Sequence, residues 1–184
     1  LGLSTEAIVI LSVGEMTKNK NQELIIRTVS EYKKKGEKIC YALCGKGTEE
    51  EHLRGLVAEL GVESEVKFLG YHKDIYEVYK MADIFVFPSL REGMPVALME
   101  AMASGLPVIC SDIRGNRDLL ENEKGGVLVE GHKVEDYVKA LEWMVENKIS
   151  WEKMGDFNRR KAEKFDKKNV VGIMEKMYEA VKQK

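Results

Sequence analysis

Two glutamates and one lysine are the side chains of this sequence best suited to act on a polar ligand. Glu92 and Glu100 stand eight positions apart in LREGMPVALMEAMASG, where an apolar run separates them, and Lys20 lies in a polar loop. Burying a carboxylate among apolar neighbours costs free energy unless hydrogen-bond donors satisfy it. Glu100 is therefore expected either to accept an internal hydrogen bond or ion pair, or to face a cleft where a diol of a ligand donates two hydrogen bonds.

The residues between the two glutamates predict a turn that binds an anion. Gly93 allows the main chain to approach a ligand closely, and Pro95 favours the first position of a helix that ends at Gly105. The amides of Met94 and Val96 then point outward at the positive end of the helix dipole. That arrangement suits a phosphate or a diphosphate.

The charged side chains near this turn are suited to two different roles. Glu92 lies just outside the turn and would repel a phosphate, so its carboxylate is better suited to accept hydrogen bonds from the neutral hydroxyls of a sugar. Lys20 is the expected cation for the phosphate. The alternative for Lys20 is a solvated surface residue, which is the ordinary state of a lysine in a polar loop.

The elements that must position these residues alternate between short apolar runs and amphipathic helices. Six continuous apolar runs predict strands that are buried on both faces of a parallel sheet. They cover residues 7–13, 38–44, 65–70, 83–88, 107–111 and 126–129. The alternation with helices predicts an α/β fold, a Rossmann-like doubly wound parallel sheet of about six strands.

Seven helices are expected between and after these strands. Apolar stripes and end signals place them at residues 22–35, 48–60, 74–81, 95–104, 134–146, 151–165 and 169–181. Thr48 and Glu51 match a capping box at the start of the second helix. The basic residues of 159–168 are expected to form a solvated helix face, with contact to an anionic membrane surface as the alternative.

Composition excludes several classes of protein. Of 184 residues, 44% are hydrophobic and 33% are charged, as in ordinary globular domains, and the net charge of −2 gives no reason to expect a nucleic-acid partner. No apolar run approaches the roughly 20 residues that span a bilayer, and no secretory signal is recognised. Because the chain begins with leucine, we expect it to be part of a longer protein.

The cysteines indicate a reducing compartment. Cys40, Cys44 and Cys110 all lie in apolar, strand-like runs, so they are expected to be buried thiols rather than metal ligands or redox partners. An odd number of cysteines without a secretory signal favours the cytoplasm. His52 and His132 are expected to be surface residues.

Three loops at the carboxyl ends of the strands are the expected ligand-binding segments. They cover residues 14–21, 45–48 and 88–95. Gly45-Lys46-Gly47 is only a fragment of a dinucleotide fingerprint, and neither a P-loop nor an Asp-x-Asp metal motif is present. We therefore expect no resident cofactor and no metal ion.

The stretch around the two glutamates resembles a known family signature. PSLREGMPVALMEAMASGLPVICSD, with Glu92 and Glu100, resembles the donor-binding signature of retaining glycosyltransferases of the GT-B fold, most closely glycosyltransferase family 4. The further segments SVGEMTKNKNQELIIRTV, GKGTEEEHLRGLVAELGVESEVKFLGY, MADIFVFPS and GNRDLLENEKGGVLV follow in family order. The resemblance implies that residues 1–184 form a single C-terminal nucleotide-sugar-binding domain, and that an N-terminal acceptor domain lies outside this chain.

The resemblance implies a role for each matching position. Lys20 would bind the donor diphosphate and Glu92 would contact the donor sugar, which makes them the expected catalytic pair. Glu100 would hold the ribose, and Tyr71 and His72 would contact the base. The other expected donor-binding residues are Gly14, Glu15, Gly45, Gly93, Met94, Pro95 and Val96.

One position departs from the family pattern. Many members carry an arginine directly after the first-loop glycine, as a second cation on the diphosphate, and here that residue is Glu15. Arg91, Arg114 or Arg117 is the hypothesised replacement. The departure slightly favours one alternative, a nucleotide-sugar-binding module without catalysis; a GT-B nucleotide-sugar epimerase is another. A nicotinamide dehydrogenase is disfavoured, because the first strand is not followed by its fingerprint.

The function that the resemblance implies is sugar transfer by the whole enzyme, of which this chain alone is expected to be inactive. The donor is expected to be a nucleotide diphosphate sugar, a UDP-sugar in preference to a GDP-sugar, and the acceptor a hydroxyl group. Transfer would retain the anomeric configuration and serve bacterial exopolysaccharide, capsule or other cell-surface glycan synthesis. The expected location is the cytoplasm, with peripheral contact at the inner face of the membrane through a lipid-linked acceptor as a further expectation.

Overall fold

The apolar runs of the sequence form six parallel strands, because a continuous apolar strand can be buried on both faces. The structure, a computed structural model, describes residues 7–36 and 38–166. Its strands are β1 (Ile8–Val13), β2 (Ile39–Cys44), β3 (Val66–Gly70), β4 (Ile84–Phe87), β5 (Val108–Ser111) and β6 (Gly126–Val129). They form one sheet in the order β3-β2-β1-β4-β5-β6, in which all neighbours are parallel. The predicted fold class is confirmed.

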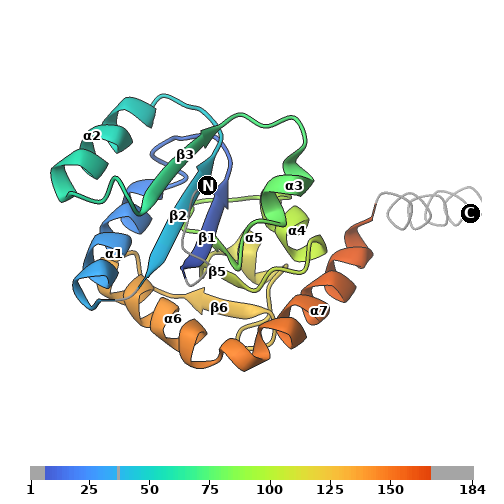
Figure 1. The fold of residues 1–184 in the computed structure, drawn as a ribbon. Coiled ribbons are helices and arrows are strands. Elements are labelled where there is room, and N and C mark those ends of the chain that lie inside the picture. The colour runs from blue at the N-terminus through green and yellow to red at the C-terminus, as the bar shows by residue number, and fades with distance from the viewer. Residues whose placement is uncertain (1–6, 37, 167–184) are drawn as a thin grey trace, which may run out of the picture.

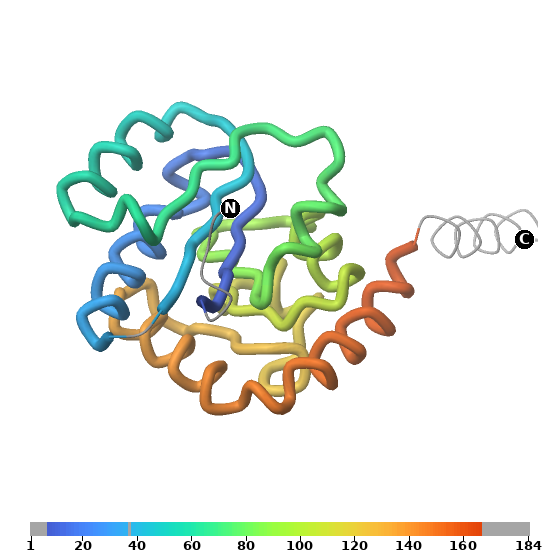
Figure 2. Tube along the Cα trace, in the orientation of Figure 1, coloured from blue at the N-terminus to red at the C-terminus, as the bar shows by residue number. Residues whose placement is uncertain are grey.

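The direction in which the chain crosses the sheet reverses between β3 and β4. The chain builds outward from β1 to β2 and β3, and then returns to the other side of β1 to place β4, β5 and β6 (Figure 2). The loops that follow β1 and β4 therefore meet near the centre of the carboxyl edge of the sheet. Doubly wound sheets bind their ligands at such a switch point.

Helices cover both faces of the sheet (Figure 1). The helices are α1 (Gln22–Lys34), α2 (Glu50–Leu60), α3 (Ile75–Tyr79), α4 (Val96–Ala103), α5 (Arg114–Arg117), α6 (Val134–Glu146) and α7 (Trp151–Ala162). Short 3₁₀ turns, Lys148–Ser150 and Glu163–Phe165, flank α7. Helices α1, α2 and α6 pack on one face, α3 and α4 on the other, and α7 contributes to both cores.

Alternation along the central strands divides the core in two. Ile10 and Ile84 point to the face covered by α1, α2 and α6, whereas Leu11, Phe85 and Phe87 point to the face covered by α3 and α4. All five side chains are buried. This two-sided burial is the reason why the strands read as continuous apolar runs rather than as alternating ones.

The helix ends differ from the predictions in four places. The capping box at Thr48 is wrong, because Glu49 is the N-cap of α2 and no side chain caps that helix. Pro95 is the N-cap of α4 instead of its first residue. Helix α5 was not predicted, since four residues are too short to show a periodic pattern. The helix predicted at 151–165 is α-helical only as far as Ala162, and its last turn, Glu163–Phe165, is a 3₁₀ turn. The helix predicted at 169–181 lies outside the described residues.

Several smaller predictions can also be compared with the structure. All three cysteines are buried free thiols, as predicted. His52 and His132 are exposed, also as predicted. Of the basic stretch, Arg159 forms an ion pair with Asp156. None of the helices in the described ranges combines the length and the apolar character needed to cross a membrane.

Candidate functional site

Main-chain hydrogen bonds join the loops at the carboxyl ends of β1, β2 and β3. The amide of Gly14 donates to the carbonyl of Cys44 (2.9 Å), and the amide of Gly45 donates to the carbonyl of Gly70 (2.8 Å). Further along, Met16 N donates to the carbonyl of Lys46 at 3.0 Å. The three loops are therefore fixed by their backbones, which leaves their side chains free to face a ligand.

Gly45 is the residue that allows this close approach. Its φ of +143° belongs to a region that side-chain-bearing residues rarely adopt, and a Cβ atom there would overlap the carbonyl oxygen of Gly14. The requirement for glycine at this position is thus set by contact between the loops.

A cavity of about 570 Å³ opens beside these loops. We call it the Tyr71 cavity. It is lined by Val13, Gly14, Glu15, Cys44, Gly45, Lys46, Tyr71, His72, Lys73, Ile75 and Glu100. The Tyr71 ring is 75% exposed and so presents an aromatic face to solvent, whereas the His72 ring is anchored, its Nε2 lying 3.1 Å from the carbonyl oxygen of Leu69.

Glu100 lies on the α4 side of the cavity and is held by a buried tyrosine. The hydroxyl of Tyr79 lies 3.0 Å from Glu100 Oε2 and 3.1 Å from the carbonyl oxygen of Ala97. Burial, together with the negative charge of Glu100, raises the pKa of Tyr79 well above its ordinary value. The hydroxyl therefore keeps its proton at neutral pH and orients one carboxylate oxygen.

Both roles considered for Glu100 are present, because its carboxylate accepts an internal hydrogen bond from Tyr79 and also lines a cavity. Glu100 is exposed, while Leu98, Ala101 and Met102 carry the buried face of α4. The apolar sequence around Glu100 is explained differently, since Val96 and Met99 line a second cavity of about 550 Å³ together with it. Glu100 thus stands between two cavities with its carboxylate available to a ligand.

Lys20 and Glu92 meet at the switch point between β1 and β4. Lys20 Nζ lies 2.6 Å from Glu92 Oε1, and it also lies 4.9 Å from the centre of the Phe87 ring. The exposed fractions of the two charged side chains are 24% and 12%. A charge pair that is mostly shielded from water interacts more strongly than a surface pair.

Two further contacts fix the loop that carries Glu92. Asn19 accepts a hydrogen bond from the amide of Leu90 (2.8 Å) and its side-chain amide donates to the carbonyl of Arg91 (2.9 Å). On the other side, a Cβ at Gly115 of α5 would lie 2.6 Å from the carbonyl oxygens of Glu92 and Gly93. Helix α5, which the sequence analysis missed, therefore supports this loop by backbone contact.

Helix α4 begins directly after the loop that carries Glu92. Among the described residues, the amides of Met94, Val96 and Ala97 have no recorded acceptor, and the N-cap Pro95 offers no side-chain cap. Met94 and Val96 are exposed, at 66% and 60%. The predicted outward-facing amides are thus available to an anion.

The structure brings the predicted site residues together in two groups. Gly14, Glu15, Gly45, Tyr71, His72 and Glu100 line the Tyr71 cavity. Lys20, Glu92, Gly93, Met94, Pro95 and Val96 lie on the adjoining loop-to-helix segments and do not line that cavity. Lys20 and Gly14 bring the two groups together, since a Cβ atom added at Gly14 would lie 3.7 Å from Cε of Lys20.

The candidate second cations are not equivalent. Arg117 forms an ion pair with Asp112 at 2.9 Å, whereas the exposed side chains of Arg91 and Arg114 have no recorded partner in the described ranges. Lys46 and Lys73, which sequence reasoning did not single out, line the Tyr71 cavity directly. Their positions directly after β2 and β3 could have indicated, from the sequence, that they lie at the ligand-binding edge of the sheet.

Within the described ranges, no group of three or more His, Cys, Asp or Glu residues is arranged to hold a metal ion.

Comparison with known proteins shows the family to which this chain belongs. The model of a family described as "Glycosyl transferases group 1" matches residues 1–164. The chain is 31% identical over 165 residues to an uncharacterized glycosyltransferase of Haemophilus influenzae, covering 88% of this chain and 46% of that protein. It is 32% identical over 153 residues to the UDP-Gal:alpha-D-GlcNAc-diphosphoundecaprenol alpha-1,3-galactosyltransferase of Escherichia coli, covering 81% and 39%.

A solved structure has the same fold. The pneumococcal O-GlcNAc transferase GtfA, crystallised with UDP and GlcNAc, superposes with a TM-score of 0.84 at 22% identity, covering 97% of this chain and 37% of that chain. The chain thus spans less than half the length of each of these three proteins. Its sheet and helices match the C-terminal domains of GT-B glycosyltransferases, and the chain belongs to the family of glycosyl transferases group 1.

Proposed function

We propose that this chain is the donor-binding domain of a retaining glycosyltransferase of family 4. The whole enzyme moves a sugar from a nucleotide diphosphate sugar to an acceptor hydroxyl. The proposal includes a bacterial cell-surface glycan, such as an exopolysaccharide or capsule, as the product, and an N-terminal domain of the same enzyme as the partner that supplies the acceptor site.

The observation that carries this proposal is the position of Glu100. Its carboxylate lines the Tyr71 cavity and is oriented by Tyr79, and its helix α4 begins directly after the loop that carries Glu92. A nucleotide with its ribose diol on Glu100 would extend its base toward Tyr71 and His72. Its diphosphate would then reach the amides at the start of α4 and the ammonium of Lys20.

The charges around the diphosphate support sugar transfer. When the bond between the sugar and the diphosphate breaks, negative charge develops on the leaving group. Lys20 and the N-terminus of α4 are preorganised to stabilise that charge, and fixed donors of this kind contribute on the order of a hundredfold or more in rate. Glu92, next to Lys20, is placed to accept hydrogen bonds from the hydroxyls of the transferred sugar.

A UDP-sugar is the proposed donor, with no resident cofactor. The Tyr71 cavity, at about 570 Å³, has the size of a small-ligand site. The galactosyltransferase relative is named for a UDP-sugar, and GtfA was crystallised with UDP. These names describe those proteins, and they are the reason to test uracil first.

A binding module without catalysis is the second candidate. It is favoured by Glu15, an exposed carboxylate on the rim of the Tyr71 cavity. A negative charge at Glu15 repels the diphosphate. The positive charges of Lys46 and Lys73, which line the same cavity, offset this repulsion.

Calorimetric titration of the chain with UDP, GDP and ADP tests the proposal. We expect saturable binding of UDP at a one-to-one ratio, weaker binding of GDP and ADP, and loss of binding in Glu100→Ala. Failure of a folded chain to bind any nucleotide, repeated with the N-terminal domain restored, would refute it. Binding by the two-domain protein without sugar transfer or hydrolysis from any UDP-sugar tested would favour the binding module.

A further inference from the structure

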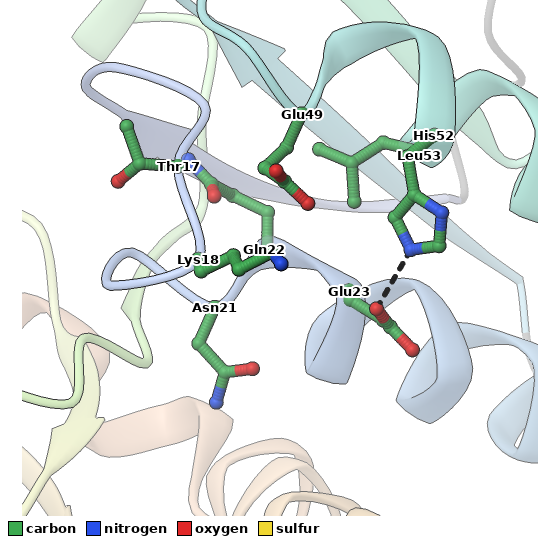
Figure 3. A pocket seen from close by; sticks show the side chains of 8 residues that line it. All are labelled: Thr17, Lys18, Asn21, Gln22, Glu23, Glu49, His52 and Leu53. Carbon is green, nitrogen blue, oxygen red and sulfur yellow. Dashed lines mark hydrogen bonds and ion pairs between the residues drawn. The ribbon is translucent and has the colours of Figure 1, made fainter.

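Another polar cavity, seen from close by in Figure 3, lies between the first loop and the starts of α1 and α2. We call it the Gln22 cavity. It has a volume of about 560 Å³ and is lined by Thr17, Lys18, Asn21, Gln22, Glu23, Glu49, His52 and Leu53. The loop of residues 14–21 separates the cavities, since Gly14 and Glu15 line one and Thr17 and Lys18 line the other. None of its lining residues is assigned a role in the proposed donor site.

Gln22 gives the clearest indication of a ligand. The side chain is 5% exposed, and its Nε2 donates to the carbonyl of Glu15 at 3.0 Å, which fixes the orientation of the amide. The other end of that amide, Oε1, is buried and has no hydrogen-bond partner among the described residues. A buried carbonyl oxygen without a donor costs free energy, on the order of 1–3 kcal/mol, and a hydroxyl in the cavity would supply the missing donor.

Two opposite charges share the cavity without pairing. Glu49 is half-buried, and Figure 3 shows its carboxylate pointing from the start of α2 toward α1. Lys18 is exposed on the facing loop. No ion pair of either residue is recorded within the described ranges, although both line one cavity. An anionic ligand would be repelled by Glu49 and a cationic ligand by Lys18, so the charges favour a neutral ligand with both donors and acceptors.

The remaining lining residues limit the shape of the ligand. His52 Nε2 lies 2.9 Å from Glu23 Oε2 and closes one end of the cavity with a satisfied pair (Figure 3). Arg27 also pairs with Glu23, at 2.8 Å, so that carboxylate is neutralised by its own neighbours. Leu53 contributes a buried apolar surface beside Glu49. A ring with hydroxyls at its edge and C–H groups on its face matches this combination.

We propose that the Gln22 cavity binds a neutral saccharide. Hydroxyl groups of the sugar donate to Glu49 and to Gln22 Oε1 and accept from Lys18, while the ring packs on Leu53. Because the cavity and the proposed donor site share the loop of residues 14–21, the saccharide is assigned as a part of the acceptor glycan that lies outside the acceptor site of the N-terminal domain. That assignment to the acceptor rests on the proposed function, whereas the sugar-binding site itself does not.

The test is a titration of the ¹⁵N-labelled chain with methyl glycosides of glucose, galactose and N-acetylglucosamine and with lactose, followed by NMR. We expect saturable shifts in the amides of residues 17–23 and 49–53. Glu49→Ala should weaken binding by about tenfold or more, because it removes a charged acceptor. Glu49 makes no side-chain cap to α2, so this change leaves the helix start intact.

Matched controls separate the site from general effects. Glu51→Ala changes the same residue type two positions further along α2, at an exposed side chain outside the cavity, and should leave saccharide binding unchanged. UDP binding should be the same in both variants, which reports an intact fold and an intact donor site. Gln22→Met, which keeps the volume and removes the buried carbonyl, should weaken binding as Glu49→Ala does.

The possible results distinguish failure of the saccharide site from failure of the proposed function. Absence of shifts in both segments with every saccharide, or shifts that Glu49→Ala leaves unchanged, would overturn the inference. UDP binding without saccharide binding would refute this site alone. Saccharide binding without nucleotide binding would leave the site standing and refute the proposed function.

Discussion

Lys20 and Glu92, which are 72 positions apart in the sequence, form a hydrogen-bonded ion pair of 2.6 Å across the switch point of the sheet. The pair has a consequence for binding order. Lys20 is proposed to bind the diphosphate and Glu92 the sugar. In the structure, the ammonium of Lys20 and the carboxylate of Glu92 bind each other, so neither is free for its proposed ligand group. A diphosphate that attracts Lys20 would weaken its contact with Glu92 and so free that carboxylate for sugar hydroxyls.

Removing the cation should affect the diphosphate selectively. In Lys20→Ala, we expect UDP affinity to fall by about ten- to a hundredfold, as for loss of a charge-assisted hydrogen bond, while uridine affinity changes less than about twofold. Parallel calorimetric titrations with the two ligands measure the difference. Equal losses for UDP and uridine would contradict the role assigned to Lys20.

Removing the partner of that cation should act in the opposite direction. Glu92→Gln neutralises the carboxylate that holds Lys20, so we expect UDP to bind a few-fold more tightly and the sugar part of a UDP-sugar to contribute less. The comparison is the affinity ratio of UDP-sugar to UDP. The matched control is Glu77→Gln, which changes an exposed glutamate of α3 that pairs with Lys80. Weaker UDP binding in Glu92→Gln would argue against competition for Lys20.

Glu100→Gln should separate binding from folding. The side chain is exposed, and an amide oxygen can still accept the hydrogen bond from Tyr79, so we expect a melting temperature close to that of the parent chain. Uridine and UDP affinities should both fall, by about tenfold, because the ribose loses a charged acceptor. Unfolding of this variant would instead assign Glu100 a structural role.

Two glycine substitutions should have opposite effects. Gly45→Ala places a Cβ against the carbonyl of Gly14 at a φ of +143°, so it should destabilise the domain and disrupt nucleotide binding. Gly55→Ala lies in the interior of α2, where a Cβ meets open space, and should stabilise it by about 0.5–1 kcal/mol. Chemical denaturation of both variants measures these changes. A tolerated Gly45→Ala would show that the loops can separate.

Buried tyrosines should make the domain sensitive to alkali. Burial raises the pKa of Tyr41, and burial together with nearby negative charge raises the pKa of Tyr79. The folded state then retains protons that the unfolded state loses above about pH 10. Stability is therefore complete below that pH and decreases above it, with a slope of up to about 1.4 kcal/mol per pH unit for each tyrosine.

Denaturant titrations between neutral pH and pH 11 would check this dependence. Tyr79→Phe should make the alkaline decrease shallower, while it lowers stability at neutral pH by about 1 kcal/mol, because Glu100 and the carbonyl of Ala97 lose their common donor. An unchanged alkaline slope in this variant would show that Tyr79 ionises as readily in the folded state as in the unfolded one.

The sequence was sufficient to predict the sheet because every strand is a short run that only a two-sided core can bury. Each observed strand lies within one residue of its predicted bounds. The capping box failed for a tertiary reason: the amide of Glu49 donates to the carbonyl of Met16, so contact with the first loop determines where α2 begins. The local Thr-x-x-Glu pattern contains no information about that loop.

The candidate site was predicted less completely, since pairing between loops depends on strand order. The exposure of Glu100 could not be read from its apolar neighbours, because Val96 is exposed and Met99 is only partly buried, and both line a cavity. Tyr79 was missed because a tyrosine inside a short helix gives no sign of what its hydroxyl reaches. Helix α5 was missed for its length, and with it the support that Gly115 gives to the loop of Glu92.

The loops after β1, β2 and β3 are joined through main-chain atoms, which every residue type possesses. Tyr71, His72 and Lys73 project from this frame without contributing to it, apart from the contact of His72 with Leu69. Substitution at these positions therefore costs the domain little stability. The part of the site that is proposed to meet the base can therefore diversify between descendants of one ancestor, while Gly45 stays constrained. We expect single mutations at these exposed positions to change the proposed donor preference.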